Sequence, residues 1–467
     1  MTKQLDETID GFRERIIEAI RQNVSVRSVR GEPEEGAPFG KGPRKALDDF
    51  LALSESLGFR TGVFEDMAGW AEYGDACAPM VCVLGHLDVV PEGDGWTYPP
   101  FGGEVHGGRI YGRGVVDDKG PVICSLFALK AIADSGIPLG KRVRILTGTN
   151  EETGSAAIRK YVSSGQDLPV WGFTPDADFP LINGEKGIIM CEGEAPFGPK
   201  GDIQVMSIKG GIADNVVPAR CKAVLKTGPE GKERIRYTID NWEGPAGTSV
   251  SCEENEDGTL TVSVEGISAH GSTPQMGINS IAWMAKLLLT LGVGGEQGRF
   301  LSAVNRLMGT ENHGESLGIC LYDGVSRYTS LCWGTIAAGE GKVSFTINPR
   351  YPITFRKDDV IPAMQSSFRK EGIKLTVKKA EDPLFMPQDS KLVRKLMKVY
   401  RERTGSDEKP KAIGGGTYAK AMPNILAFGP ERAGRKYNIH ETDENWEIDE
   451  MIETTKIIAS AIVELAQ

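Results

Sequence analysis

The sequence predicts an α/β fold: a mostly parallel central sheet flanked by helices, with an α+β domain inserted into it. Three observations support this fold class. Short apolar runs alternate with helical patterns up to about Gly184, an order typical of a parallel sheet. Strands and turns then predominate to about Pro383, after which helical patterns and a buried strand resume. We therefore expect a main domain made of residues 1–184 and 384–467, with residues 185–383 as the insert.

Two amphipathic helices are expected to open the chain. Apolar residues recur at helical spacing over residues 5–22, with charged residues between them. The same spacing returns over residues 46–57, and Gly58 ends it. Each helix can therefore bury one face against the sheet.

Two buried strands and their helices follow. The apolar run Val81–Leu84 predicts a short strand, and a helix with buried positions begins after Gly120. The run that starts at Val143 predicts a second strand, followed by a helix over residues 155–164. In parallel sheets, sites form beyond the carboxyl ends of the strands, so these two ends are where a site is expected.

The insert and the last part of the chain complete the predicted fold. Two helical stretches, Gly277–Leu291 and Asp359–Glu371, are expected among the strands of the insert. The main domain then resumes with a helix over Asp389–Arg403, a buried strand at Ile425–Gly429 and a closing helix over Ile448–Leu465.

Composition and charge narrow the class of partner. The 467 residues include 54 Lys+Arg and 64 Asp+Glu, a net charge of −10, and the charge runs are short and mixed in sign. This pattern argues against nucleic acid or a membrane surface. The start of the chain lacks the features of a signal peptide, and no eighteen apolar residues run together. Because the eight Cys form no Cys-x-x-Cys pair, we expect reduced thiols and a cytoplasmic protein with a small-molecule or peptide partner.

Metal-competent side chains follow the first predicted strand. His86 and Asp88 are two residues apart and share a face, so Asp88 can accept the second ring N–H of His86. For this pair alone, a buried His bonded to an Asp without any metal is the simpler interpretation. Asp117 and Asp118, at the entrance of the next helix, are either an N-cap or a ligand.

Further candidates follow the later strands. Glu151 and Glu152 come directly after the second strand. Asp176 and Asp178 lie beyond a third short strand, where an ordinary turn pair is the alternative. His440 lies among carboxylates past the last strand. Two His and several carboxylates at strand ends suit a pair of divalent ions with a bridging carboxylate, whose natural chemistry is amide hydrolysis.

Six motifs span nearly the whole chain: Gly85-His-Leu-Asp88, Gly112-Arg-Gly-Val-Val-Asp-Asp-Lys-Gly120, Asn150-Glu-Glu-Thr-Gly154, Thr174-Pro-Asp-Ala-Asp178, Ala269-His-Gly-Ser-Thr-Pro274 and Ile439-His-Glu441. Together they resemble the co-catalytic zinc peptidase family of aminoacylases, carnosinase-type dipeptidases, glutamate carboxypeptidases and succinyl-diaminopimelate desuccinylases. Asp117-Asp-Lys-Gly-Pro121, Asn183-Gly-Glu-Lys-Gly187 and the long insert are similar to the PepV-like dipeptidase branch.

The resemblance implies a zinc-peptidase catalytic domain with two divalent metal ions. Zn is the expected metal, with Mn or Co as alternatives. The implied ligands are His86 and Asp176 for one ion, Glu152 and His440 for the other, and Asp117 as the bridge.

The resemblance also implies roles for residues beside the metals. Glu151 would be the general base, and Asp88 would orient His86. In the family, the peptide bond after the residue that matches Asp117 is often cis. Asp178 remains an alternative to Asp176 as the ligand.

The insert becomes a lid under the same resemblance. His270 would stabilise the oxyanion, and Asn215 and Arg350 would contact the substrate. Gly415 and Gly416 would offer backbone N–H groups to the substrate's C-terminal carboxylate. In two-domain relatives a His from a partner subunit completes each site. The longer insert here would replace that subunit, so we expect an active monomer.

A dipeptidase acting on dipeptides is therefore the expected function. An N-acyl amino-acid deacylase or desuccinylase on the same centre is the alternative, which would need extra Arg or Lys for a second substrate carboxylate. The acidic loop Asp88–Asp94 favours a free ammonium instead. A non-catalytic metal-dependent binding protein is a remote alternative, because Glu151 and His270 are both present.

Three residues are not assigned to the chemistry. His106 and His313 match no motif and are predicted to be solvated or packing side chains. Tyr418 is predicted to be structural, as are the Cys residues.

Overall fold

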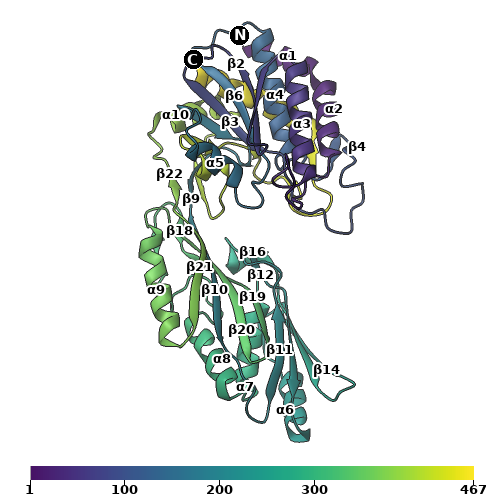
Figure 1. The fold of residues 1–467 in the computed structure, drawn as a ribbon, viewed down its shortest axis with the longest axis vertical. Helices are drawn as coiled ribbons and strands as arrows, with labels where there is room; N and C mark the ends of the chain where they lie inside the picture. The colour runs from purple at the N-terminus through teal and green to yellow at the C-terminus, as the bar shows by residue number, and fades with distance from the viewer. Residues whose placement is uncertain (1) are drawn as a thin grey trace. The chain divides into compact units, whose positions relative to one another are not determined.

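The structure is a computed structural model that describes residues 2–467 (Figure 1). The chain forms two compact units. Unit 1 comprises Met1–Asn183, Met386–Lys411 and Gly416–Gln467, and unit 2 comprises Gly184–Phe385 and Ala412–Gly415.

The sheet of unit 1 is parallel at its centre. Six of its nine strands lie in the order β1 (Arg60–Phe64), β2 (Ala68–Tyr73), β6 (Arg142–Gly148), β3 (Met80–His86), β7 (Trp171–Thr174) and β24 (Ile425–Ala427). Strand β3 is parallel to both β6 and β7, and β24 is parallel to β7. Strands β1 and β2 add antiparallel pairs at one edge. The predicted α/β fold class is confirmed: the central sheet is parallel at β6, β3, β7 and β24 and has antiparallel pairs towards its edges.

Seven helices of eight residues or more belong to the described part of unit 1. They are α1 (Thr2–Gly11), α2 (Arg13–Val24), α3 (Lys41–Ser56), α4 (Lys119–Asp134), α5 (Ala156–Ser163), α10 (Lys391–Thr404) and α11 (Ile448–Ala466). The single opening helix predicted over residues 5–22 is divided at Phe12, whose ring packs edge-on against Phe127 of α4. Helix α4 is buried along almost its whole length and packs against β3 and α11.

The sheet of unit 2 is antiparallel throughout. Its order is β14 (Ser249–Glu254), β15 (Leu260–Glu265), β13 (Arg220–Lys226), β11 (Gln204–Gly210), β19 (Ser330–Gly339), β20 (Lys342–Tyr351), β10 (Gly187–Pro196) and β21 (Lys374–Glu381). Helices α7 (Ser280–Thr290), α8 (Gly295–Leu307) and α9 (Lys357–Lys370) pack on it and close a single apolar core.

The prediction of only two helices in the insert was wrong. Helices α7 and α9 match the predicted stretches, but α6 (Pro229–Asp240) and α8 are also present. Only Gly231 and Ile235 of α6 are buried, so α6 has almost no apolar stripe to detect. Helix α8 contains Gly295 and Gly298, and glycine disfavours helix by about 1 kcal/mol relative to alanine.

Short elements complete both units. They are β4 (Glu104–His106), β5 (Arg109–Tyr111), β8 (Ala177–Asp178), β9 (Ile182–Glu185), β12 (Val216–Val217), β16 (Ala269–His270), η1 (Pro274–Met276), β17 (Tyr322–Asp323), β18 (Arg327–Tyr328), β22 (Leu384–Phe385), β23 (Lys411–Ile413), η2 (Tyr418–Ala421), β25 (Pro430–Glu431) and β26 (Asn445–Glu447). Pairing of β5 with β4 on one side and β26 on the other forms a small sheet of its own.

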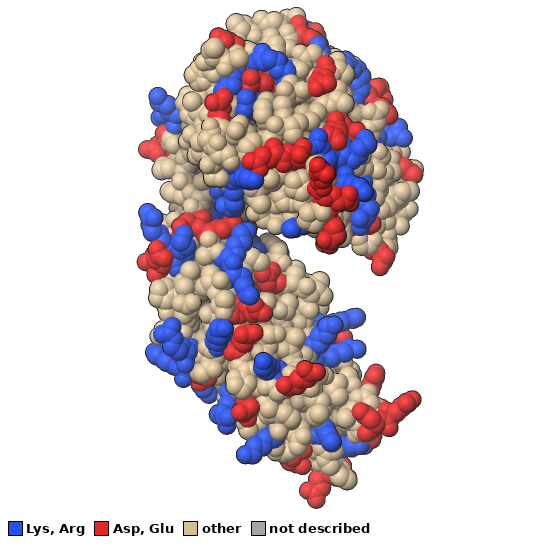
Figure 2. Space-filling model, in the orientation of Figure 1, with Lys and Arg blue, Asp and Glu red and all other residues tan. Residues whose placement is uncertain are grey.

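The surface carries both signs of charge. Basic and acidic side chains are interspersed over the face shown in Figure 2. Among the described residues, no helix is both long enough and apolar enough to cross a membrane.

Candidate metal centre

Strand β3 delivers His86 to the carboxyl end of the sheet. All seven of its residues are buried. Its pairing with β6 continues one residue further, where the Leu87 N–H donates to the Gly148 main-chain oxygen at 3.0 Å. Gly85 is required here because a Cβ atom would lie 2.4 Å from Val122 Cγ2 and 2.5 Å from Asp118 Oδ2. The Asp118 carboxylate instead accepts the His86 backbone N–H at 3.1 Å, so Asp118 supports the strand end.

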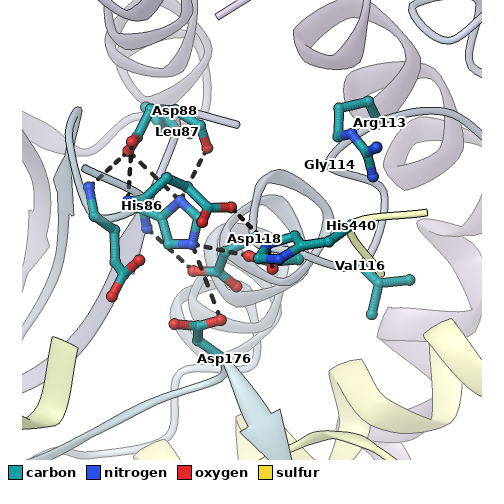
Figure 3. A network of polar contacts seen from close by, with 12 residues as sticks. His86, Leu87, Asp88, Arg113, Gly114, Val116, Asp118, Asp176 and His440 are labelled. Carbon is teal, nitrogen blue, oxygen red and sulfur yellow. Dashed lines mark hydrogen bonds and ion pairs between the residues drawn. The ribbon is translucent and has the colours of Figure 1, made fainter. Parts of the chain in front are cut away.

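The His86 ring faces two carboxylates. Its Nε2 atom lies 3.0 Å from Asp117 Oδ1 and 3.9 Å from Asp176 Oδ1. Figure 3 shows Asp176 on one side of the ring and Asp88 on the other. Asp178, two residues beyond Asp176, lies in β8, which pairs in parallel with β25. Of the two aspartates, Asp176 is the one whose carboxylate approaches the His86 ring.

The His440 ring faces the other oxygen of Asp117. His440 Nε2 is 3.0 Å from Asp117 Oδ2 and 3.0 Å from Glu152 Oε1. One ligand atom each from His86, Asp117 and Glu152 fall within 4.8 Å of one another. The peptide bond between Asp117 and Asp118 is cis, as the resemblance implies. Asp117 thus stands between two imidazoles and presents one oxygen to each.

The carboxylate of Asp88 accepts hydrogen bonds from the backbones of Glu151 and Glu152. Its Oδ1 accepts the Glu151 backbone N–H at 2.9 Å, and its Oδ2 accepts that of Glu152 at 3.2 Å. The His86 Nδ1–H makes its shorter contact with the Asp88 main-chain oxygen, at 2.9 Å, whereas Asp88 Oδ1 is 3.6 Å away. Asp88 therefore orients the ring mainly through its carbonyl, and its side chain fixes the Glu151–Glu152 turn.

The cluster brings several buried carboxyl groups close together. Burial, together with the charges of Glu152 and Asp88, raises the pKa of Glu151 to about 8. Burial and the charge of Asp117 also raise the pKa values of Glu152 and Asp176. Without a cation, these carboxyl groups tend to keep their protons.

The pKa values of the two imidazoles are also raised, but by hydrogen bonds to carboxylates and against the effect of burial. Burial disfavours the charged ring of His440, but hydrogen bonds to Asp117 and Glu152 outweigh it and raise its pKa to about 11. The same balance, with Asp117 and Asp88 as partners, raises the pKa of His86. The two rings in turn hold the pKa of Asp117 well below its usual range, against the effect of burial.

The donor set fits divalent metal ions. Imidazole nitrogens and carboxylate oxygens are the ligands of Zn²⁺ and Mn²⁺ sites, and the ligand atoms already converge. A bound cation would offset the repulsion between these carboxylates. His86, Asp117, Glu152, Asp176 and His440 are the residues that would hold the ions.

These shifts predict that the metal-free protein loses stability as pH rises from about 5 to 8. Glu151 keeps its proton up to about pH 8 when folded, whereas its ordinary pKa is 4.5, so the folded state binds more protons in this interval. The raised pKa of His440 acts in the same direction above pH 6.5. Thermal unfolding in a chelator at several pH values measures the effect, with Glu151→Gln expected to show a smaller fall. Stability that rises over this interval would contradict the assignment.

The candidate residues of unit 2 form two groups. The Asn215 main-chain oxygen accepts the Gly271 N–H at 2.6 Å, and Val216 pairs with His270 across β12 and β16. His270 is exposed, with Nδ1 2.6 Å from Ser272 Oγ. Asn215 and His270 are therefore neighbours.

The second group surrounds Arg350. Its side chain is only 4% exposed, and its Nε donates to Asn348 Oδ1 at 2.9 Å. Nη1 donates to the Gly414 main-chain oxygen at 2.7 Å, which holds the glycine loop beside the guanidinium. Gly415 belongs to unit 2, whereas Gly416 belongs to unit 1.

Two further features lie beside the centre: an ion pair that sequence reasoning missed, and Tyr418, which was predicted to be structural. The first is the buried ion pair between Arg113 Nη1 and Glu444 Oε2, at 2.8 Å, in which Arg113 belongs to the Gly112–Gly120 motif and Glu444 follows the His440 motif. Tyr418 is fully buried, with its ring edge-on to His86 at 6.0 Å between ring centroids. A Cβ on Gly148 would lie 2.1 Å from the Tyr418 hydroxyl, so the end of β6 is shaped to admit this side chain.

The unassigned histidines each have partners of their own. His106 is exposed, stacks on Tyr98 at 4.1 Å between ring centroids, and pairs with Glu104 at 2.7 Å. His313 is half-buried, with Nδ1 2.7 Å from the Thr329 main-chain oxygen.

Comparisons with known proteins cover nearly the whole chain. Residues 82–464 match the peptidase family described as M20/M25/M40. A Bacillus subtilis (strain 168) protein named "Putative dipeptidase YtjP" is 35% identical over 461 residues, which covers 97% of this chain and 98% of that protein. A Staphylococcus epidermidis protein named "Putative dipeptidase" is 30% identical over 468 residues, covering 98% of each. The crystal structure of human carnosine dipeptidase 1 has the same fold, with a TM-score of 0.61 at 16% identity, covering 100% of this chain and 99% of that one.

Proposed function

Because this chain belongs to peptidase family M20/M25/M40, we propose that it is a metal-dependent dipeptidase whose substrates are free dipeptides. One observation supports this most: similarity to proteins named as dipeptidases extends over almost the full length of the chain. The convergence of imidazole and carboxylate groups at the carboxyl end of the parallel sheet supports hydrolysis as the chemistry.

The proposed centre holds two divalent ions, with Zn as the expected metal and Mn or Co as alternatives. His86 and Asp176 would hold one ion, Glu152 and His440 the other, and Asp117 would bridge them. When bound, the ions polarise the scissile carbonyl and lower the pKa of water.

Glu151 is the proposed general base. Its backbone is fixed by Asp88, and its buried carboxyl group has a pKa raised toward the working range of an acid–base catalyst. Glu151 would accept a proton from the attacking water as the new C–O bond forms. It would then return that proton to the amine nitrogen as the C–N bond breaks.

A substrate panel tests the proposed function. The metal-free protein is reloaded with Zn²⁺ or Mn²⁺ and offered free dipeptides beside the same dipeptides carrying an N-acyl group. We expect hydrolysis of the free dipeptides, with loss of activity in a chelator and recovery on adding metal. Hydrolysis of the N-acylated compounds alone would instead indicate a deacylase.

We also propose that the insert, residues 185–383, acts as a lid and that His270 donates to the oxyanion. His270→Ala is then expected to lower kcat by about 10²- to 10³-fold, the usual effect of removing one oxyanion donor. Metal content, measured by elemental analysis, should remain that of the wild type. A fall in metal content would make His270 a ligand and contradict this assignment.

A single chain is proposed to be fully active. The monomer can be tested by mixing His270→Ala chains with Glu151→Gln chains, neither of which should regain activity. Specific activity of the wild type should also stay constant on dilution. Recovery in the mixture would show that each site is shared between two subunits.

A cytoplasmic location is proposed from the thiols. All eight Cys are free, and Cys82, Cys124, Cys191, Cys221 and Cys332 are buried. A reducing compartment suits such a set. Cell fractionation would test it, and recovery of the protein outside the cytoplasm would overturn it.

A further inference from the structure

We propose that Glu444 is a positioning residue that fixes the bridging carboxylate Asp117 relative to the ligand His440. This inference rests on the proposed metal centre, and it assigns a role to a residue outside the ligand set. The single carboxylate of Glu444 links the two loops that carry Asp117 and His440.

Each carboxylate oxygen of Glu444 accepts two hydrogen bonds. The side chain has no solvent exposure. Its Oε2 accepts hydrogen bonds from Arg113 Nη1 at 2.8 Å and from the Gly114 N–H at 3.0 Å. Its Oε1 accepts the N–H groups of Val116 at 3.0 Å and Asp117 at 3.2 Å. All four donors therefore come from the loop that ends at Asp117, and the last is the backbone N–H of Asp117 itself.

The loop that carries His440 is closed by hydrogen bonds between residues 438 and 443, directly before Glu444. Asn438 Nδ2 donates to the Asp443 main-chain oxygen at 3.1 Å, and the Glu441 N–H donates to the Asn438 oxygen at 3.0 Å. Asn438, His440 and Asp443 all have positive φ angles, of 56°, 60° and 58°. These bonds tie the turn that carries His440 to the residue directly before Glu444, so a shift of Glu444 is expected to displace His440.

The two loops are also aligned by their flanking strands. Strand β26 begins directly after Glu444 and pairs with β5, which ends directly before Gly112. The Gly112 N–H donates to the Glu444 main-chain oxygen at 3.0 Å. In Figure 3, Arg113, Gly114 and Val116 lie on the His440 side of the cluster. Strand pairing brings the loops together, and the Glu444 carboxylate then sets their separation.

A carboxylate is needed at this place rather than an amide. Four donors converge on two oxygens, and a Gln side chain would turn an NH₂ group toward two of them. Residues that orient metal ligands affect metal affinity or activity about 10- to 100-fold without touching the metal. The same size of effect is expected for Glu444.

The test compares two buried carboxylates. Glu444→Gln is expected to raise the dissociation constants for Zn²⁺ about 10- to 100-fold, measured by chelator competition on the full chain. kcat should fall at limiting metal and recover partly at excess metal, whereas KM for a dipeptide should change little. Glu72→Gln is the matched control, because Glu72 is 5% exposed and pairs with Arg60, Arg142 and Arg144 at 3.1, 3.2 and 2.7 Å, on a strand that bears no ligand. It should lower the unfolding temperature and leave metal affinity unchanged.

Four outcomes would contradict the proposals, and they can be told apart. Wild-type metal affinity in folded Glu444→Gln, or an equal loss of affinity in Glu72→Gln, overturns the positioning role. Glu444→Asp keeps the charge and shortens the reach toward Val116 and Asp117, so it replaces the Gln variant if that chain fails to fold, and wild-type affinity there overturns the role as well. If the wild-type protein itself binds no divalent metal, the proposed function fails rather than the role of Glu444.

Discussion

Replacing Glu151 by Gln is expected to lower kcat by about 10²- to 10⁴-fold, the usual contribution of general acid–base catalysis. The amide cannot accept a proton from water, whereas the five proposed ligands remain in place. Metal content should therefore equal that of the wild type. Steady-state kinetics with a free dipeptide, together with elemental analysis of the same sample, measure both quantities.

The neighbouring glutamate provides a matched control for this variant. Glu152→Gln makes the same chemical change one residue along, where Glu152 Oε1 lies 3.0 Å from His440 Nε2. This variant should lose metal affinity, and added metal should restore part of its activity. Near-normal turnover in Glu151→Gln, or activity that added metal restores there, would remove Glu151 from the role of base.

Replacing Asp117 by Ala is expected to lower the content of both metal ions together, and activity with it. The two oxygens of Asp117 face different imidazoles at 3.0 Å, so one substitution removes a ligand from each proposed ion. Isothermal titration of metal-free protein with Zn²⁺ should show both affinities weakened.

Asp118→Asn is the control for the Asp117 variant. The side-chain oxygen of Asn can still accept the His86 backbone N–H that Asp118 accepts at 3.1 Å, so both metals should remain bound. Two tightly bound ions in Asp117→Ala would show that Asp117 is not the bridge. Loss of only one ion would make it a ligand of a single metal.

Much of the fold follows from local patterns in the sequence. The run Val81–Leu84 is apolar at every position, and the run Val143–Leu146 is apolar except at Arg144. All of these residues are buried in the parallel strands β3 and β6. Patterns of this kind are visible because a buried strand needs apolar side chains along its own length. Helix α6 was missed for the converse reason, since it buries little and leaves no apolar stripe.

The candidate ligands were also accessible from the sequence. Each follows a predicted strand or opens a predicted helix, and parallel strand order brings such positions to one edge of a sheet. The structure places His86, Asp117, Asp176, Glu152 and His440 there, with contacts of 3.0 to 3.9 Å. Their roles as ligands stay predictions for the metal measurements above.

The sequence by itself determined the fold class, the family resemblance and the residues able to bind metal, because these depend on residue type and on spacing along the chain. Only the tertiary structure decided which atom of Asp88 approaches His86 and which groups meet at Glu444. Residues 113 and 444 are far apart in sequence, yet their side chains lie 2.8 Å apart once β5 and β26 pair. No local pattern records such a contact, since the acceptors of a buried loop can come from any part of the chain that folding brings near.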